Sequence, residues 1–235
     1  MKKIFYIVVA GLLFSGCGSG ENEDGMNGDG SADEVDGQQE EQQDSPEIDI
    51  SLTKIRDIPR DCEFEGEVVD AYTWTDENGL NYFMRTMGKP TEGEKEISED
   101  LPSRSQYLYA YHYVEDEKGG IKLLCQITDF VKDCQFDLII GHELDAISLT
   151  DLDENGLGEV SFIYRLNCTS DVSPATQKLI LIENGDKYVL RGHTSFMEHE
   201  GEYTVGEEFK NAPDGFQEHA EKLWSKHLTE YDFEL

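Results

Sequence analysis

The chain has 235 residues and carries 51 Asp and Glu against 19 Lys and Arg, so its formal net charge at pH 7 is −32. A negative field of this size repels nucleic acid and anionic lipid headgroups, which makes DNA and RNA poor partners. Cations, cationic peptides and neutral glycans remain open as partners. Residues 51–235 are enough for one domain with its own hydrophobic core.

The N-terminus has the features of an export signal. Lys2 and Lys3 precede the apolar run IFYIVVAGLLF, which is too short to cross a bilayer comfortably, and small residues then lead to Cys17. The segment LFSGC resembles the lipobox of bacterial lipoproteins, in which the cysteine accepts a diacylglycerol and becomes the first mature residue. The resemblance implies a signal peptide over residues 1–16 and membrane anchoring through Cys17. The alternative is an ordinary secretory signal with a chance cysteine.

The segment after Cys17 is strongly acidic. Residues 18–50 contain twelve Asp and Glu, no Lys or Arg and almost no large apolar side chains. Such a segment cannot bury enough surface to fold, and its like charges repel one another. We therefore predict a lipidated cysteine with a disordered acidic tether over residues 17–50. The stretch GSGENED resembles the surface-export signal of Bacteroidota lipoproteins, which implies an outer-membrane lipoprotein at the cell surface. A plain linker facing the periplasm is the alternative.

Residues 51–235 are predicted to form a single mainly β (α+β) domain of antiparallel strands and hairpins. The clearest hairpin is QKLILIENGDKYVLRG, in which ENGD separates an apolar run from an alternating one. Residues 89–104 carry Pro, Gly and charge without periodicity and predict a surface loop. The one predicted helix is C-terminal and amphipathic, with Asp214 as its expected cap. Its apolar face comprises Phe216, Ala220, Leu223, Trp224 and Leu228.

The segment QYLYAYHYV alternates strictly, which predicts a strand that is apolar on both faces. One face carries Tyr107, Tyr109, Tyr111 and Tyr113. A tyrosine row of this kind predicts a packed sheet face, with a stacking platform for sugar rings as the alternative. His112 lies on the opposite, apolar face, where we predict a structural histidine with a satisfied hydrogen bond.

Four cysteines remain once Cys17 is assigned to lipid, and an even set agrees with export to an oxidising compartment. These predicted disulfide cysteines are Cys62, Cys125, Cys134 and Cys168. The sequence leaves three pairings open, and we favour Cys134 with Cys168 because each lies beside a predicted strand. The spacings contain no CxxC pair, which disfavours a zinc site.

The segment TDLDENGLGEV, residues 150–160, is the strongest candidate site. It is two residues longer than the similar turn in AYTWTDENGL, and the insertion adds a carboxylate. Oxygen ligands at alternating positions suit calcium. The predicted ligands are the side chains of Asp151, Asp153, Asn155 and Glu159 and the carbonyl of Leu157. Phe162 stands where an EF-hand needs a bidentate Glu, which excludes that motif. The loop resembles the DxDxDG loops of extracellular β-repeat proteins, which implies a structural calcium ion; an acidic hairpin-type turn is the alternative.

No motif of a known catalytic class occurs in the sequence: it contains no GxSxG, HExxH, P-loop or GxGxxG after a strand. Glu143, Asp145 and Glu159 could supply a carboxylate pair for glycoside chemistry, but such pairs arise by chance in so acidic a chain. We therefore predict a protein that is not an enzyme, with a glycan-active enzyme or a protein-binding or inhibitor module as alternatives.

Several segments recur in the order of one family: AYTWTDENGLNYFM, LYAYHYV, LLCQITDFVKDCQFDL, TDLDENGLGEVSFIYRLNCTSDVSP and KYVLRG. Together they resemble exported Bacteroidota proteins described as surface polysaccharide biosynthesis proteins, over most of residues 62–192. The resemblance implies a role in producing lipopolysaccharide or surface glycan without a defined reaction. The implied partners are surface glycan or glycan-assembly proteins. Asp171, Lys178 and Arg191 are candidates for a binding role, with structural anchoring as the alternative.

Overall fold

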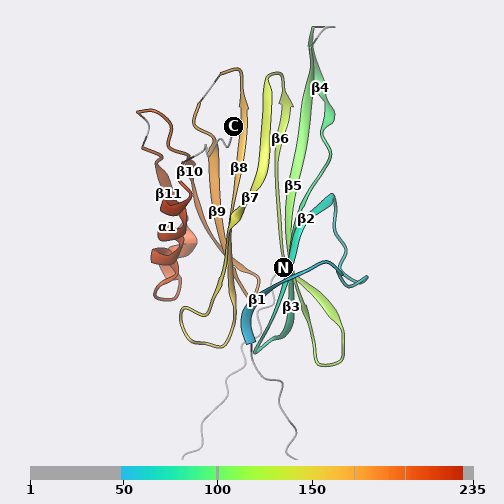
Figure 1. Cartoon of the computed structure of the whole chain (residues 1–235), viewed down its shortest axis with the longest axis vertical. Coiled ribbons are helices and arrows are strands. Elements are labelled where there is room, and N and C mark those ends of the chain that lie inside the picture. The colour runs from blue at the N-terminus through green and yellow to red at the C-terminus, as the bar shows by residue number, and fades with distance from the viewer. Residues whose placement is uncertain (1–48, 99–100, 172, 199, 230–235) are drawn as a thin grey trace, which may run out of the picture. The chain divides into compact units, whose positions relative to one another are not determined.

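A computed structural model describes residues 49–229 except 99–100, 172 and 199 (Figure 1). The predicted signal peptide, Cys17 and nearly all of the predicted tether lie outside the described residues. The described part is mainly β, with two antiparallel sheets and a C-terminal helix, so the predicted fold class is confirmed. No helix among the described residues combines the length and the hydropathy needed to span a bilayer.

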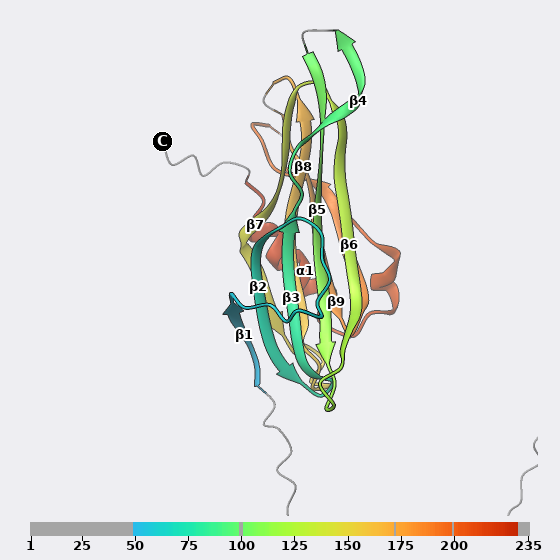
Figure 2. The same cartoon turned by 90° about the vertical axis from the view of Figure 1, so that its right-hand side faces the viewer.

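The first sheet has the order β1-β2-β3-β5-β4. The strand β6 also belongs to this sheet and pairs with the long strand β5. Figure 2 shows β2, β3, β5 and β6 side by side in this sheet. Its strands are β1 (Asp49–Ile55), β2 (Glu67–Asp76), β3 (Gly79–Met87), β4 (Thr91–Ser98), β5 (Leu101–Glu115) and β6 (Ile121–Cys134). Residues 88–90 separate β3 from β4, and β4 pairs with the first residues of the long strand β5.

The second sheet has the order β11-β10-β9-β8-β7. Its strands are β7 (Asp137–Thr150), β8 (Glu159–Thr169), β9 (Thr176–Glu183), β10 (Asp186–His193) and β11 (Tyr203–Val205). A 3-10 helix η1 (Glu207–Asn211) and the helix α1 (Phe216–Lys226) follow. The hairpin predicted from ENGD is formed by β9 and β10, whose residues pair without a bulge from Glu183–Asp186 to Thr176–His193.

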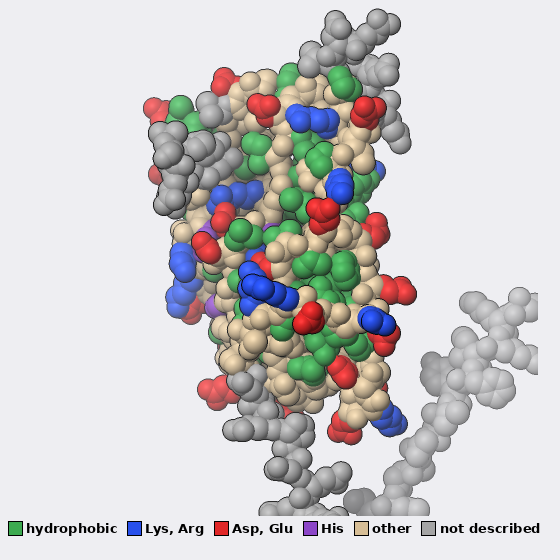
Figure 3. Space-filling model, turned by 45° about the vertical axis from the view of Figure 1, so that its right-hand side comes forward, with side chains coloured by type: hydrophobic (Ala, Val, Ile, Leu, Met, Phe, Trp, Pro, Cys, Tyr) green, Lys and Arg blue, Asp and Glu red, His purple; other side chains and the backbone are tan. Residues whose placement is uncertain are grey.

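The hydrophobic core has three parts. The largest lies between the two sheets and joins residues such as Trp74 and Phe83 of the first sheet to Phe162 of the second. A second part lies between the outer face of the second sheet and α1, whose Trp224 is buried there. The third covers the outer face of the first sheet beneath the segment 56–66. Figure 3 shows hydrophobic side chains gathered on the side of the molecule that the first sheet forms.

Two local predictions are wrong. Residues 89–104 are not a loop, because β4 and the start of β5 pair there, for example Thr91 with Ser105. β4 is held through backbone pairing at a sheet edge, so its sequence carries no apolar periodicity that could have announced it. Asp214 does not cap α1: Gly215, in the left-handed conformation with φ 92°, occupies the cap position, and no side chain bonds the helix N-terminus.

Candidate functional site

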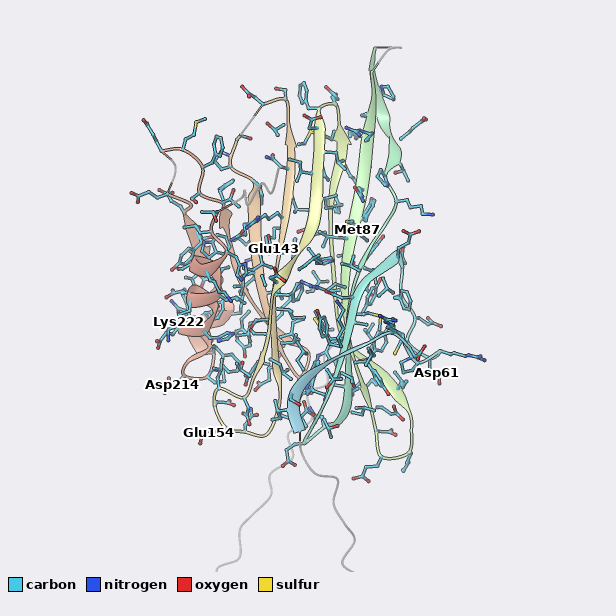
Figure 4. The ribbon with its side chains drawn as sticks, viewed as in Figure 1. Asp61, Met87, Glu143, Glu154, Asp214 and Lys222 are labelled. Atoms are coloured by element: carbon cyan, nitrogen blue, oxygen red, sulfur yellow. A yellow bond between two sulfur atoms is a disulfide. The ribbon has the colours of Figure 1, made fainter. Side chains whose placement is uncertain are left out.

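The acidic loop between β7 and β8 lies at one end of the two packed sheets, beside two hairpin turns. The amide of Glu77, in the β2–β3 turn, donates to the carbonyl of Gly156 at 2.9 Å. Asn155 Nδ2 donates to Glu183 Oε1, at the β9–β10 turn, at 2.8 Å. The loop is therefore tied to both sheets, and Figure 4 shows Glu154 at its outer tip.

The loop brings three of its predicted ligands together. One carboxylate oxygen each from Asp151, Asp153 and Glu159 lies within 4.8 Å of the other two. The oxygens of Asp151 also accept hydrogen bonds from the amides of Asn155 (3.0 Å) and Gly156 (3.2 Å), which hold the loop closed. Asn155 departs from the prediction, because its Oδ1 accepts the Leu157 amide at 2.8 Å and stabilises the turn.

Glu159 is fully buried at the start of β8. Its carboxylate accepts hydrogen bonds from Thr150 Oγ1 at 2.8 Å and from the Leu152 amide at 3.1 Å. Burial raises the pKa of Glu159 to about 7; the hydrogen bonds from Thr150 and Leu152 act in the opposite direction, and Glu183 and Asp153 raise it further. A divalent cation would reduce this repulsion and favour the ionised carboxylate. The three carboxylates supply oxygen donors of the kind that calcium prefers.

The short turn TDENG, predicted to be only a turn, also anchors the acidic loop. Asp76 is buried, and its Oδ2 accepts hydrogen bonds from Trp74 Nε1 at 3.0 Å and from the Gly158 amide at 3.1 Å. Its Oδ1 accepts the Asn78 amide at 2.9 Å. This carboxylate therefore connects the first sheet to the end of the acidic loop, a contact across 82 positions that no local pattern signals.

The three predicted binding residues do not form one site. Lys178 in β9 and Arg191 in β10 lie directly opposite each other in the sheet. Asp171 follows β8 and forms a local turn, in which its amide donates to Thr169 Oγ1 at 3.2 Å. Sequence analysis missed Asp129 of β6, whose carboxylate accepts hydrogen bonds from Lys178 Nζ and from Tyr164 Oη, the latter at 2.9 Å.

The tyrosine row is a packed face, as predicted, and does not form a stacking platform. Tyr109, Tyr111 and Tyr113 are at most 8% exposed beneath the segment 56–66. Their hydroxyl groups bond that segment: Tyr111 Oη accepts the Glu65 amide at 3.0 Å, and Tyr113 Oη donates to a backbone carbonyl of the same segment. These bonds fix the segment to the sheet and leave the rings no free face for a sugar.

The cysteines form one disulfide among the described residues. Cys134 at the end of β6 bonds Cys168 in β8, as predicted, and so joins the two sheets. Cys62 and Cys125 are free and buried, so the prediction that all four form disulfides is wrong. The cause is their placement: Cys62 lies on the outer face of the first sheet and Cys125 between the sheets. Burial raises the pKa of Cys62 to about 11, which keeps its thiol protonated.

The other titratable candidates have structural contacts. His112 is buried, its Nε2 lies 2.9 Å from Asn81 Oδ1, and burial lowers its pKa to about 4. Its Nδ1 is buried without a hydrogen-bond partner among the described residues, so the predicted hydrogen bonding is met at one ring nitrogen only. Glu143 forms an ion pair with Arg165 at 3.0 Å (Figure 4). Glu159 pairs with Thr150, and Glu143 lies seven residues before Thr150 in β7. Seven strand residues span roughly 20 Å, which therefore separates Glu143 from Glu159. This separation exceeds the roughly 5–10 Å of a glycosidase carboxylate pair.

Comparison with known proteins gives no matching family model, no matching curated protein and no matching solved structure.

Proposed function

We propose that this chain is an exported lipoprotein, anchored in the outer membrane through Cys17, whose β-sandwich supports the assembly or display of surface polysaccharide by binding. The observation that carries the export proposal is the Cys134–Cys168 bond, because disulfides form and persist in oxidising compartments. The lipobox-like segment LFSGC supports anchoring. The resemblance to surface polysaccharide biosynthesis proteins supports the role in glycan production.

Binding in place of catalysis is supported by the contacts of the chemically active side chains. Glu143 is paired with Arg165, and Glu159 lies roughly 20 Å of strand away from it. The free thiols Cys62 and Cys125 are both buried, and burial raises both thiol pKa values, which suppresses the nucleophilic thiolate.

A structural calcium ion at the acidic loop is part of the proposal. Asp151, Asp153 and Glu159 supply convergent hard oxygen ligands, and the loop contacts hairpin turns of both sheets. An ion held there would stabilise the end of the sandwich. It would take no part in a reaction, which agrees with a binding protein.

The experiment that tests the proposed function compares surface polysaccharide in the parent strain and in a strain that lacks this chain. The deletion strain is complemented with the intact gene and, in parallel, with the Cys17→Ala form. We expect lost or shortened polysaccharide in the deletion strain and restoration by the lipidated form only. An unchanged profile in the deletion strain would refute the polysaccharide role, and full restoration by Cys17→Ala would refute the need for anchoring. Protease treatment of intact cells then separates the surface-facing from the periplasm-facing orientation.

A further inference from the structure

A basic groove lies along the open edge of the first sheet, where β6 faces β9 and β10 of the second sheet. Its volume is about 440 Å³, within the roughly 300–1,000 Å³ typical of ligand sites. We define the basic groove by the residues that decide its chemistry. These are Asp129 of β6, Lys178 and Ile180 of β9, and Lys187, Val189 and Arg191 of β10.

The groove concentrates positive charge in an otherwise acidic chain. Lys178 and Arg191 are directly opposite each other on neighbouring strands, an arrangement of like charges that destabilises a sheet. Asp129 is the one carboxylate that lines the groove, and Lys178 Nζ bonds it. Within the described part of the chain, the side chains of Lys187 and Arg191 form no hydrogen bond or ion pair. Two cations are thus left without a counter-charge.

The spacing of these cations defines the length of a ligand. Lys187 and Arg191 lie four residues apart on one strand, which is about 13 Å at 3.3 Å per residue. Val189 and Ile180, which pair across β9 and β10, are buried in the core beneath the groove and hold the two strands in register between the charged ends. A single phosphate or acetate ion cannot span this distance. An extended chain with repeated negative groups can contact both charged ends together.

We propose that the basic groove binds the carboxylate groups of an acidic glycan chain. This inference rests on the proposed function, because it names the chemical class of polysaccharide that the protein would hold. Arg191 and Lys187 would each bind a carboxylate through charge-assisted hydrogen bonds. Asp129, which pairs with Lys178, compensates the third cation of the groove and leaves Lys187 and Arg191 to the ligand.

The net charge of −32 does not prevent such binding under physiological conditions. At about 0.15 M salt the Debye length is about 8 Å, so exposed acidic residues farther away than this are largely screened. A carboxylate in direct contact with Arg191 or Lys187 remains inside this length. The expectation from composition alone, which left cations, cationic peptides and neutral glycans open as partners, is therefore modified by the local arrangement of charge.

The test is calorimetric titration of the full chain, in non-ionic detergent at about 0.15 M salt, with tetragalacturonate. Fully methyl-esterified tetragalacturonate serves as the uncharged probe and monomeric galacturonate as the short one. We expect tetragalacturonate to bind and both other probes to bind at least about ten-fold more weakly. Binding of the ester as tight as that of the acid, or the absence of tetragalacturonate binding, would overturn the inference.

Matched variants locate the binding to the groove. Arg191→Gln and Lys187→Gln should each weaken tetragalacturonate binding by about five- to ten-fold. Arg56→Gln removes the same charge from an exposed residue outside the groove and should leave the affinity unchanged. Equal affinities of Arg191→Gln and Arg56→Gln would overturn the assignment, provided that both melt at the wild-type temperature.

Asp129→Asn should change the affinity for tetragalacturonate in the opposite direction. This change removes the only carboxylate that lines the groove among the described residues, so it should strengthen tetragalacturonate binding by about three-fold or more, which is the reverse of what a damaged site would give. Weaker binding by a correctly folded Asp129→Asn chain would contradict the inference. The deletion strain tests the proposed function separately: altered polysaccharide together with no tetragalacturonate binding would reject the carboxylate specificity alone.

Discussion

Glu159 couples the acidic loop to stability through its ionisation. Burial raises its folded-state pKa to about 7, above the unfolded value, so the folded chain binds this proton more tightly. By linkage, the protonated Glu159 contributes to the free energy of unfolding fully below about pH 4.5. This contribution, about 3 kcal/mol, is lost as the pH rises through 7. With a chelator present, we predict that Glu159→Gln lacks this loss, so its free energy of unfolding exceeds that of the wild type at pH 8. Urea titrations at pH 5.5 and pH 8 measure the difference.

Calcium should remove most of this stability difference between the wild type and Glu159→Gln. At saturating calcium and pH 8, the wild type should gain about 2–3 kcal/mol, or roughly 5–10 °C in Tm, because the ion binds only the folded loop. Glu159→Gln should gain much less, since it has lost a ligand. Glu154→Gln is the control, because Glu154 is exposed on the same loop and lies outside the carboxylate cluster. Identical wild-type melts with calcium and with chelator would show that the loop is only a hydrogen-bonded turn.

At the scale of elements, the disulfide holds the end of β6 against β8. Cys134 and Cys168 are 34 residues apart, and closing a loop of this length stabilises the folded state by about 3–4 kcal/mol in the chain-entropy account. The double variant Cys134→Ser, Cys168→Ser should lose about this much in urea unfolding. Adding a reducing agent should destabilise the wild type and leave the double variant unchanged. If the reducing agent destabilised the wild type and the double variant equally, its effect would not come from the Cys134–Cys168 bond.

The pairing of β10 with β11 depends on a close approach at Gly192. A Cβ atom there would lie 1.9 Å from the backbone oxygen of Glu202, so the strands would have to separate. Gly192→Ala should cost about 1–3 kcal/mol. Gly141→Ala in β7 is the matched control, because nothing lies within 4 Å of its added Cβ, and it should be neutral or slightly stabilising. Thermal melts compare them, and equal Tm values would contradict the close packing of β10 on β11.

Local sequence signals predict much of the fold, and the rest depends on long-range contacts. The hairpin Thr176–His193 and the alternation of β5 were predictable because turn chemistry and period-two patterning act within a few residues. The spacing of the loop residues alone also predicted that Asp151 and Glu159 lie close together. By contrast, the basic groove needs the register of β9 with β10 and a contact between Lys178 and Asp129 across 49 positions, which no local pattern encodes.

For the whole molecule, we propose that this sandwich binds a surface polysaccharide without altering it. The most direct measurement incubates the purified full chain with polysaccharide extracted from the source cells, followed by affinity electrophoresis and by sizing of the recovered glycan. We expect retardation of the protein, weaker for Arg191→Gln than for Arg56→Gln, and a glycan of unchanged length. Shortened glycan would instead identify a glycan-active enzyme, and absence of retardation would contradict a polysaccharide-binding function.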